Sequence, residues 1–384
     1  MDDPAGRWQR ARDALDAHVA AGRLPGYAVA VDHAGETTIW AGGRMALDDD
    51  RQMQTGTRCR IASLTKPVGG ALLMTLVERG ELALDDEVGR WLPELAAPRV
   101  LRDPAGPLDR TVAADQPILV EQLATMTWGL GALFPPCPLS EAMEEWGVAP
   151  GPIPPQMDAD EYIARIGGLP LAFQPGRAWL YHTGSDVLSV LVSRATGRSV
   201  AELVAERITG PLGMRDTGFW CDPDLLPAVY MPAADGLELF DPPDAAFARP
   251  PRFEALGSGL VSTVEDYLRF MTALRDGGGP ILSAGSVEIM TSDRLTAVQR
   301  ASSRVILAEG SSWGLNLEVD LTRTEPWTNP GRFGWNGGFG TAANVDPVAD
   351  LTIVFFSQRM LESPAPPATF TDLWRAAYAE VGAG

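Results

Sequence analysis

The chain has 384 residues, which is enough for one large hydrophobic core or two smaller ones. Hydrophobic residues make up 45% and charged residues 21% of the sequence, which indicates a globular protein rather than a disordered one. The net charge of −19 argues against nucleic acid or an anionic membrane as a partner. No apolar run reaches the roughly 18 residues that a membrane-spanning helix needs, and the charged, helical beginning of the chain does not resemble a signal peptide.

The cysteines and histidines limit the chemistry that the chain can support. The three cysteines are odd in number, widely spaced and without ligand-like neighbours: Cys59, Cys137 and Cys221. This pattern predicts a reducing, cytoplasmic setting, with no structural metal and no cofactor. There are also only three histidines: His18, His33 and His182. So few histidines give poor support to a serine–histidine–acid triad.

The predicted elements begin with an amphipathic helix at residues 8–22. Two strands follow within residues 26–43, joined by a turn that contains Gly35. After a loop, a helix starts near Ser63 and stays apolar through Leu76. A turn and a short helical stretch lead to residues 95–120, which are rich in proline and aspartate and predict a surface loop.

The middle of the chain is mainly helical in its periodicity. A short helix is predicted at 119–127, and further helices are predicted at 158–167, from near Ser185, and at 199–208. The proline-rich segment 131–157 carries aromatic residues and predicts a wall or lid of a pocket, with an irregular surface excursion as the alternative. Residues 221–256 are loop-like, and the next helix is capped by Ser262 or Thr263.

From residue 312 the apolar pattern changes to a period of two, which predicts several strands before a last helix at 366–381. Strand signal therefore lies at both ends of the sequence. The predicted fold class is α/β (α+β): an antiparallel sheet built from both chain termini and flanked by helices, with an inserted, mostly helical domain. Residues 1–58 and 300–384 would form the sheet domain and 59–299 the helical domain, with the active site in the cleft between them.

The helix that starts near Ser63 carries the first candidate for catalysis. Residues three apart share a helix face, so Ser63 and Lys66 should point the same way. A serine hydroxyl needs a base to become a nucleophile, and a buried lysine amine can act as one because burial lowers its pKa. The helix N-terminus also offers free N–H groups beside the serine oxygen. A helix start with a solvated lysine is the alternative interpretation of this four-residue pattern.

Two further segments could complete a site around Ser63. Tyr181 precedes a predicted helix, and a tyrosine near two positive centres would ionise more easily and could move protons; a buried tyrosine with a satisfied hydroxyl is the alternative. Residues 333–341, FGWNGGFGT, are unusually rich in glycine for a strand. If this is an edge strand, the N–H of Gly338 could pair with that of Ser63 as an oxyanion hole.

Six ordered segments, spread over most of the chain, resemble one family. They are Ser63-x-x-Lys66, TMTWGLG at 125–131, PG-x-x-W-x-Y with DVL at 175–188, PLGM-x-DTGF at 211–219, GLVST-x-x-DYLRF at 259–270, and WNGGFGT with VDP at 335–347. Together they resemble the serine β-lactamase-like superfamily, which includes class C β-lactamases, D-alanyl-D-alanine carboxypeptidases and family VIII carboxylesterases.

The resemblance implies roles for the matching positions. Ser63 would be the acylated nucleophile, Lys66 its partner and Tyr181 the general base and acid, while the N–H groups of Ser63 and Gly338 would form the oxyanion hole. We expect the substrate-binding residues to be Trp128, His182, Thr183, Trp335, Asn336 and Gly337. His182 could face the cleft or pack beneath it, and packing is the favoured interpretation.

Two departures from the β-lactamase pattern favour the esterase branch. Thr183 stands where class C β-lactamases have asparagine, and its hydroxyl is a poorer match for the side-chain amide of a β-lactam. Trp335 replaces the lysine that helps to hold the carboxylate of the drug, and the loss of that contact is worth about 1.5–3 kcal/mol. Tryptophan at this position resembles the family VIII esterases.

Ser312 is a rival nucleophile, because residues 310–314 fit the G-x-S-x-G pattern. That motif needs a sharp turn from a strand into a helix, whereas a strand-like sequence follows here, so Ser312 is predicted to be a structural turn residue. We therefore predict a cytoplasmic serine hydrolase that cleaves small-molecule esters of apolar acyl groups. An acyltransferase acting on a specialised metabolite is the alternative, a β-lactamase or D,D-peptidase is less favoured, and a non-catalytic penicillin-binding-like module is the least favoured.

Overall fold

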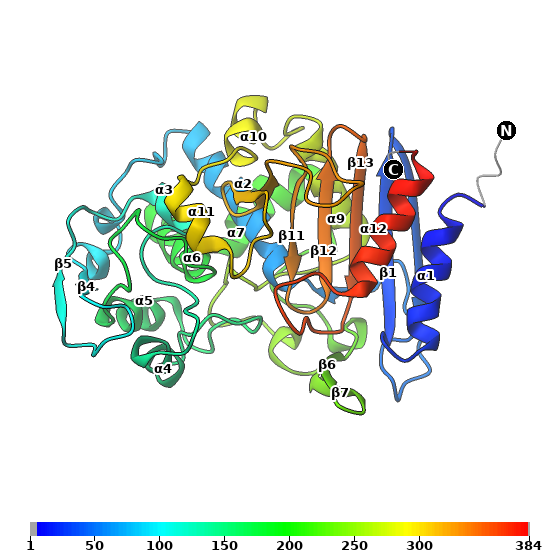
Figure 1. The fold of residues 1–384 in the computed structure, drawn as a ribbon, viewed down its shortest axis with the longest axis horizontal. Helices are drawn as coiled ribbons and strands as arrows, with labels where there is room; N and C mark the ends of the chain where they lie inside the picture. The colour runs from blue at the N-terminus through cyan, green and yellow to red at the C-terminus, as the bar shows by residue number, and fades with distance from the viewer. Residues whose placement is uncertain (1–5, 383–384) are drawn as a thin grey trace.

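A seven-stranded antiparallel sheet, in the order β2-β1-β13-β12-β11-β10-β9, forms one side of the molecule (Figure 1). The computed structural model describes residues 6–382, so the outermost parts of the predicted sheet domain, 1–5 and 383–384, lie outside the described residues. The strands of this sheet are β1 (Gly26–His33), β2 (Glu36–Gly43), β9 (Ser311–Trp313), β10 (Glu318–Asp320), β11 (Phe333–Gly337), β12 (Thr341–Asp346) and β13 (Leu351–Ser357). Both ends of the chain supply strands, and the predicted fold class is confirmed.

Helices cover both faces of the sheet. The helices of the described residues are α1 (Gln9–Ala20), α2 (Thr65–Glu78), α3 (Val120–Ala124), α4 (Pro138–Glu145), α5 (Ala159–Gly168), α6 (Thr183–Thr196), α7 (Val200–Val204), α8 (Gly210–Leu212), α9 (Val264–Arg275), α10 (Ala284–Met290), α11 (Ala297–Ser303) and α12 (Ala368–Glu380). Short 3₁₀ helices are η1 (Ala62–Leu64), η2 (Val88–Arg90), η3 (Pro93–Leu95), η5 (Pro223–Leu225) and η6 (Ala246–Ala248), and η4 (Ala205–Thr209) is a π-helix. Figure 1 shows α1 and α12 together at one end of the molecule and most other helices on the far side of the sheet.

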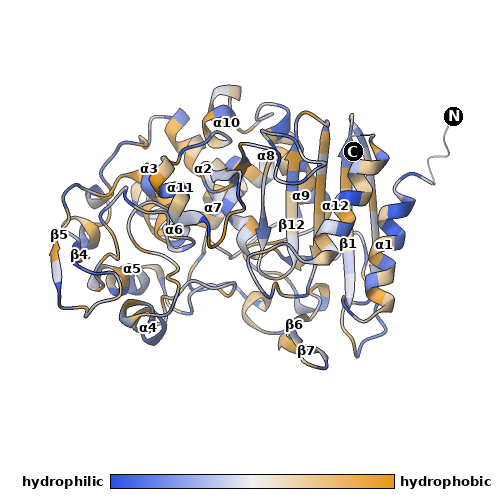
Figure 2. Ribbon diagram, in the orientation of Figure 1, coloured by the Kyte–Doolittle hydropathy of each residue, from blue (hydrophilic) through white to orange (hydrophobic). Residues whose placement is uncertain are grey.

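The alternation of side chains along β1 explains this layering. Tyr27, Val29 and Val31 point to one face, where they form a buried cluster with α1 and α12. Ala28 and Ala30 point to the other face and belong to the main core, and α9 packs on β1 and β13 there. Figure 2 shows hydrophilic and hydrophobic residues on both terminal helices, as expected for helices with one buried face. Because α9 lies within residues 59–299 yet packs on the sheet, the division into two domains stays a prediction.

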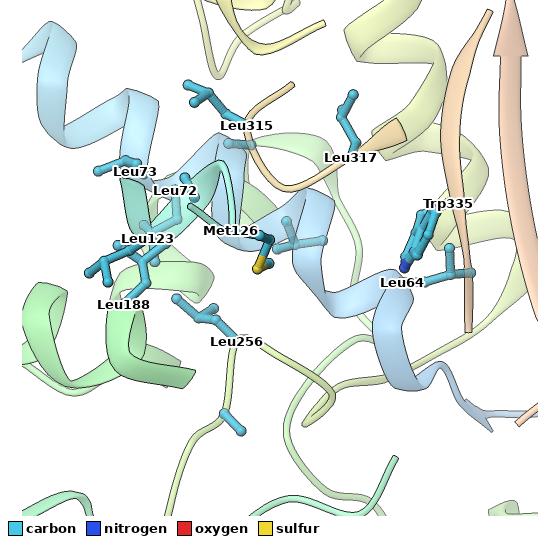
Figure 3. Close-up of a cluster of buried hydrophobic side chains, with 14 of the residues drawn as sticks. Leu64, Leu72, Leu73, Leu123, Met126, Leu188, Leu256, Leu315, Leu317 and Trp335 are labelled. Atoms are coloured by element: carbon cyan, nitrogen blue, oxygen red, sulfur yellow. The ribbon is translucent and has the colours of Figure 1, made fainter. Parts of the chain in front are cut away.

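Helix α2 runs through the middle of the main core. Every residue from Thr65 to Leu76 is buried, which is why its sequence is apolar on all sides rather than amphipathic. Figure 3 shows Leu72 and Leu73 of α2 among leucines from neighbouring segments. A Cβ on Gly70 would lie 2.4 Å from the carbonyl oxygen of Leu315, so only glycine allows this close contact. The core therefore fixes the helix that starts beside Ser63.

Two segments that the sequence predicted to be loops contain β-hairpins. Residues 95–120 include β4 (Arg99–Leu101) and β5 (Thr111–Ala113), and residues 221–256 include β6 (Val229–Ala233) and β7 (Gly236–Asp241). Much of each hairpin is exposed, so the apolar alternation that would predict a strand is weak. A further short pair joins β3 (Cys59–Arg60) to β8 (Val261–Ser262).

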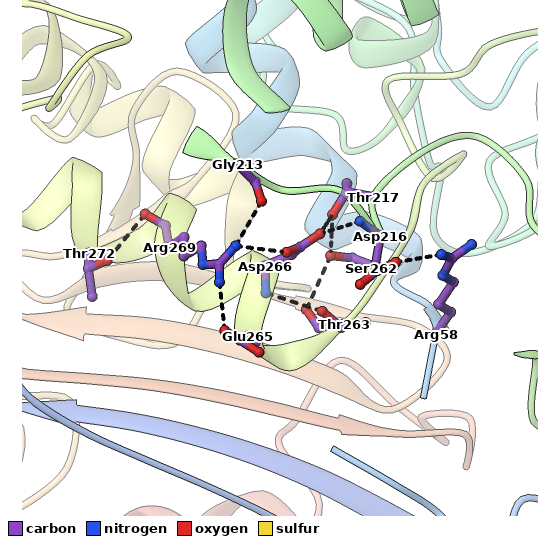
Figure 4. A network of polar contacts seen from close by, with 10 residues as sticks. All are labelled: Arg58, Gly213, Asp216, Thr217, Ser262, Thr263, Glu265, Asp266, Arg269 and Thr272. Carbon is purple, nitrogen blue, oxygen red and sulfur yellow. Dashed lines mark hydrogen bonds and ion pairs between the residues drawn. The ribbon is translucent and has the colours of Figure 1, made fainter. Parts of the chain in front are cut away.

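A polar network ties residues 213–217 to the start of α9 (Figure 4). The Asp266 carboxylate accepts hydrogen bonds from the Asp216 N–H at 2.7 Å and from the Thr217 hydroxyl at 3.0 Å. Thr263, rather than Ser262, is the N-cap, because its hydroxyl accepts the Asp266 N–H at 3.2 Å. The network anchors the segment that continues to Gly218, whose backbone pairs with that of Val261 in β8.

Candidate active site

Ser63 and Lys66 lie at the junction of η1 and α2. The Lys66 Nζ is 3.1 Å from the Ser63 Oγ, so the two side chains point the same way, as the spacing predicted. Ser63 is 7% exposed and Lys66 is fully buried. The residue before the serine, Ala62, has a φ of +45°, a conformation that costs energy for a residue with a side chain and is often found at functional sites.

The surroundings of the Lys66 amine favour its neutral form. Its Nζ donates to the Gly257 carbonyl oxygen at 2.6 Å and lies 3.2 Å from the Nδ1 of His182. Burial lowers the pKa of Lys66 from 10.5 to about 7, although the nearby Asp186 carboxylate acts in the opposite direction. About half of the Lys66 side chains would therefore be uncharged at pH 7, in contrast to a solvated lysine.

Tyr181 lies between the lysine and the sheet. Its hydroxyl accepts a 2.5 Å hydrogen bond from the Trp335 Nε1, and its ring centroid is 4.7 Å from the Lys66 Nζ. Burial raises the pKa of Tyr181, and hydrogen bonding to Ser63 and Trp335 only partly offsets this rise. The expectation that Tyr181 would ionise more easily is wrong, because burial outweighs the neighbouring donors.

The glycine-rich strand β11 forms an edge beside Ser63. β10 pairs with β11 only at Phe333 and Gly334, so the backbone of residues 335–337 continues beyond the end of this short neighbour. Although β11 lies inside the sheet, it is therefore an edge strand locally. A Cβ on Gly337 would lie 2.4 Å from the Ile61 carbonyl oxygen, so the absence of a side chain lets this strand approach the segment that leads to Ser63.

A cavity of about 390 Å³ opens in front of these groups. Six of the predicted site residues line it: Ser63, Tyr181, His182, Trp335, Asn336 and Gly338. The proline-rich segment supplies one wall through Phe134 and Pro152, as predicted for residues 131–157. An apolar wall beside a serine–lysine pair suits a substrate with hydrocarbon groups next to its reactive carbonyl.

Three predicted substrate-binding residues lie away from the cavity lining. Trp128 is fully buried in the core. Thr183 is also fully buried, and its hydroxyl donates to the Leu130 carbonyl oxygen at 2.7 Å. Gly337 acts through its close backbone packing instead of through a surface in the cavity. Tertiary packing turns the side chains of Trp128 and Thr183 inward, and Gly337 has no side chain, so a contact between these three residues and the substrate stays a prediction.

The sequence analysis missed a half-buried carboxyl group on the cavity wall. Glu318 of β10 lines the cavity with Asp320 and Arg332. Burial and the Asp320 carboxylate together raise the pKa of Glu318 from 4.5 to about 7, although Arg332 acts in the opposite direction. The alternation in residues 317–319 carried a signal, because Leu317 and Val319 point into the core and so place Glu318 on the opposite face of the strand.

Ser312 does not lie on a strand-to-helix turn. It is fully buried inside β9, and its hydroxyl donates to Asp293. Ser312 is therefore part of a strand instead of the predicted turn, and its surroundings are unlike the exposed nucleophile that the G-x-S-x-G motif requires.

The antiparallel sheet flanked by helices and the serine–lysine pair define a serine β-lactamase-like protein, and the comparison with known families agrees. The chain belongs to the Beta-lactamase family, whose model matches residues 11–377. This result confirms the resemblance drawn from the six sequence segments.

Individual relatives narrow the class further. Protein Rv1367c of Mycobacterium tuberculosis is 40% identical over 334 residues, 82% of this chain and 81% of that protein. Esterase EstB of Burkholderia gladioli is 30% identical over 343 residues, 83% of this chain and 82% of that protein. The solved structure of EstCE1, described as a hydrolase with promiscuous acyltransferase activity, has a TM-score of 0.83 at 22% identity and covers 96% of this chain and 98% of its own.

Esterases and acyltransferases both occur among the relatives, so the predicted enzyme class is confirmed, and both the esterase interpretation and the acyltransferase alternative fit it. In the part of the chain that the structure describes, no helix is long and apolar enough to cross a membrane. Within those same residues, 6–382, no group of three or more acidic, histidine or cysteine side chains could hold a metal ion.

Proposed function

We propose that the chain is a serine esterase that cleaves neutral esters of apolar acyl groups through an acyl-enzyme on Ser63. The observation that carries this proposal is the contact between the Ser63 hydroxyl and the buried Lys66 amine, 3.1 Å apart, at the base of a partly apolar cavity. An uncharged amine at that distance can take the serine proton directly.

The proposed acylation uses three side chains. The neutral Lys66 amine accepts the Ser63 proton as Oγ attacks the carbonyl carbon of the ester. The bond between that carbon and the alcohol oxygen then breaks, and the proton passes by way of the Tyr181 hydroxyl to the departing alcohol. The raised pKa of Tyr181 suits this role, because its hydroxyl stays protonated until the leaving oxygen demands a proton.

Two backbone N–H groups are proposed to stabilise the oxyanion. Ser63 and Gly338 both line the cavity, and Gly338 directly follows the part of β11 that packs against Ile61. Preorganised amides that meet developing negative charge are worth about 3–4 kcal/mol each in acyl transfer. Hydrolysis would follow the same route in reverse, with water replacing the alcohol.

Trp335 supports a preference for neutral substrates. Its indole lines the cavity and donates to Tyr181, so this position offers an aromatic surface and no positive charge. A carboxylate on the substrate would find no positively charged partner at this position. An apolar acyl chain would gain about 25 cal/mol for each Å² of apolar surface that it buries.

Transfer of the acyl group to another acceptor is the second candidate, since acyltransferases occur among the relatives. An alcohol or amine that binds in place of water would accept the acyl group from the same intermediate.

We also propose that the partner is a small-molecule ester and that the location is cytoplasmic. The location is supported by three cysteines that form no disulfide: Cys59, Cys137 and Cys221.

The test is a matched pair of serine variants. Ser63→Ala should abolish turnover of a nitrophenyl butyrate, whereas Ser312→Ala, which removes a buried hydroxyl outside the cavity lining, should leave it largely intact. Mass spectrometry after treatment with a neutral phosphonate should find the adduct on Ser63. An adduct on Ser312, or full activity without the Ser63 hydroxyl, would overturn the assignment.

A further inference from the structure

His182 contacts the lysine of the proposed site, whereas the sequence favoured simple packing. Its ring is 4% exposed, and its Nδ1 lies 3.2 Å from the Lys66 Nζ. On the other side of the ring, Nε2 lies 3.1 Å from an Asp186 carboxylate oxygen, and that carboxylate is buried as well. The four groups Ser63, Lys66, His182 and Asp186 therefore form one continuous chain of contacts.

The carboxylate determines which ring nitrogen carries the proton. An ionised carboxylate only accepts hydrogen bonds, so the neutral His182 ring must carry its proton on Nε2 and donate it to Asp186. Nδ1 is then an acceptor, and its lone pair faces Lys66. Burial and the nearby Lys66 lower the pKa of His182, which keeps the ring neutral in the range where an esterase would work.

The neutral amine of Lys66 has two N–H bonds and one lone pair. Two acceptors lie within reach of those N–H bonds, the Gly257 carbonyl oxygen at 2.6 Å and the His182 Nδ1 at 3.2 Å. When both are satisfied, the lone pair is left to face the Ser63 hydroxyl at 3.1 Å. We propose that His182, held by Asp186, is a positioning residue that aims the lone pair of Lys66 at the Ser63 proton.

The backbone around His182 is shaped for this contact. His182 has a φ of +87°, which side-chain-bearing residues rarely adopt. A Cβ on Gly257 would lie 2.3 Å from an Asp186 carboxylate oxygen and 3.2 Å from the His182 Nε2, so only glycine leaves room for the pair at this position. A histidine that only filled space would not need the acid, the glycine and the lysine at these positions.

The other titratable groups around this chain of contacts are few. Tyr181 stacks against Lys66 from one side. Tyr162 of α5 faces Asp186, and burial together with that carboxylate raises its pKa. Both phenols stay neutral over the working range. The Glu318 carboxyl group acts on Tyr181 from β10, and its own pKa is raised to about 7, so Glu318→Gln is needed to separate its contribution to the pH dependence from that of Lys66.

Two variants of similar size separate positioning from packing. His182→Asn keeps an amide oxygen near the place of Nδ1, where it can still accept from Lys66. His182→Gln instead extends its amide towards Asp186 and leaves no acceptor for the lysine. The readouts are the rate at which a neutral phosphonate labels Ser63 as a function of pH, together with kcat and KM for nitrophenyl butyrate.

We expect His182→Gln to slow the labelling of Ser63 by about ten- to hundredfold, the effect of one hydrogen bond to a charged or reacting group. KM should change by less than about twofold, because the ring is proposed to act on the Lys66 amine and not on the bound substrate. The acid limb of the rate profile should move to lower pH, since the ammonium loses an acceptor and its pKa falls. His182→Asn should retain most of the rate and the position of the acid limb.

Asp186→Asn provides a second test if the histidine variants fold poorly. The Asp186 charge raises the pKa of Lys66, so its removal should also move the acid limb to lower pH. Equal losses in both histidine variants with an unmoved acid limb, or no loss in either, would overturn the proposal. The inference rests on the proposed function, yet the two can fail separately: wild-type labelling of Ser63 without ester turnover would reject the substrate class and leave the role of His182 testable.

Discussion

The replacement of Lys66 by methionine should trade activity for stability, and the structure sets the size of the effect. The folded chain holds the pKa of this lysine near 7, against 10.5 for a free side chain. At pH 7 the unfolded chain therefore binds a proton that half of the folded chains have released, which lowers the free energy of unfolding by about 4 kcal/mol. Methionine has a similar length and carries no charge, so Lys66→Met removes this cost.

The variant also loses the hydrogen bonds of the amine. The Gly257 carbonyl oxygen and the His182 ring each lose a donor, and the Ser63 hydroxyl loses its acceptor, at about 1 kcal/mol each. The net expectation is a variant more stable than the wild type by about 1–2 kcal/mol at pH 7, with kcat lower by about two to four decades.

The pH dependence of stability is the sharper measurement. Because the folded pKa of Lys66 is depressed, the wild type should gain stability as pH rises from about 7 towards 10.5, while Lys66→Met cannot gain through this residue. In urea unfolding, the stability advantage of Lys66→Met should fall by about 2 kcal/mol between pH 7 and pH 9, so that at pH 9 the variant is no more stable than the wild type. Ser63→Ala is the control, since it is inactive but keeps the lysine and should follow the wild type. A difference that does not change with pH would refute the argument that burial holds Lys66 neutral.

Three further experiments test the groups of the site. Tyr181→Phe and Lys66→Ala should each lower kcat by about two to four decades, and the double variant should be little worse than either, because both serve one proton transfer; losses that multiply would show independent steps. Trp335→Lys should weaken hydrolysis of nitrophenyl butyrate and modestly improve recognition of anionic substrates without producing an efficient β-lactamase. If the wild type instead hydrolyses a chromogenic cephalosporin with a higher kcat/KM than the butyrate, the esterase proposal is wrong. Lys66 and Glu318 both have a pKa of about 7, so Glu318→Gln should leave the acid limb of kcat/KM in place if that limb belongs to the lysine; a limb that moves would assign it to the carboxyl group.

Local patterns in the sequence were enough for much of the fold. Short runs of apolar residues predicted β1 and β13, and a longer, mainly apolar stretch predicted the helix α2. The three-residue spacing of Ser63 and Lys66 placed both side chains on one face, since helical geometry depends only on neighbouring residues. The two exposed hairpins escaped prediction because they bury too little surface to require an alternating pattern.

The electrostatics of the site depended on contacts between segments that are far apart in the sequence. Lys66 meets His182, 116 residues later, and the carbonyl oxygen of Gly257, 191 residues later. Packing also turned Thr183 towards Leu130 and away from the cavity. Sequence spacing by itself placed only Lys66 beside the serine. Only the tertiary structure decided the protonation of Lys66 and Tyr181, because a pKa depends on the burial and on all the charges and hydrogen bonds that the folded chain brings around a group.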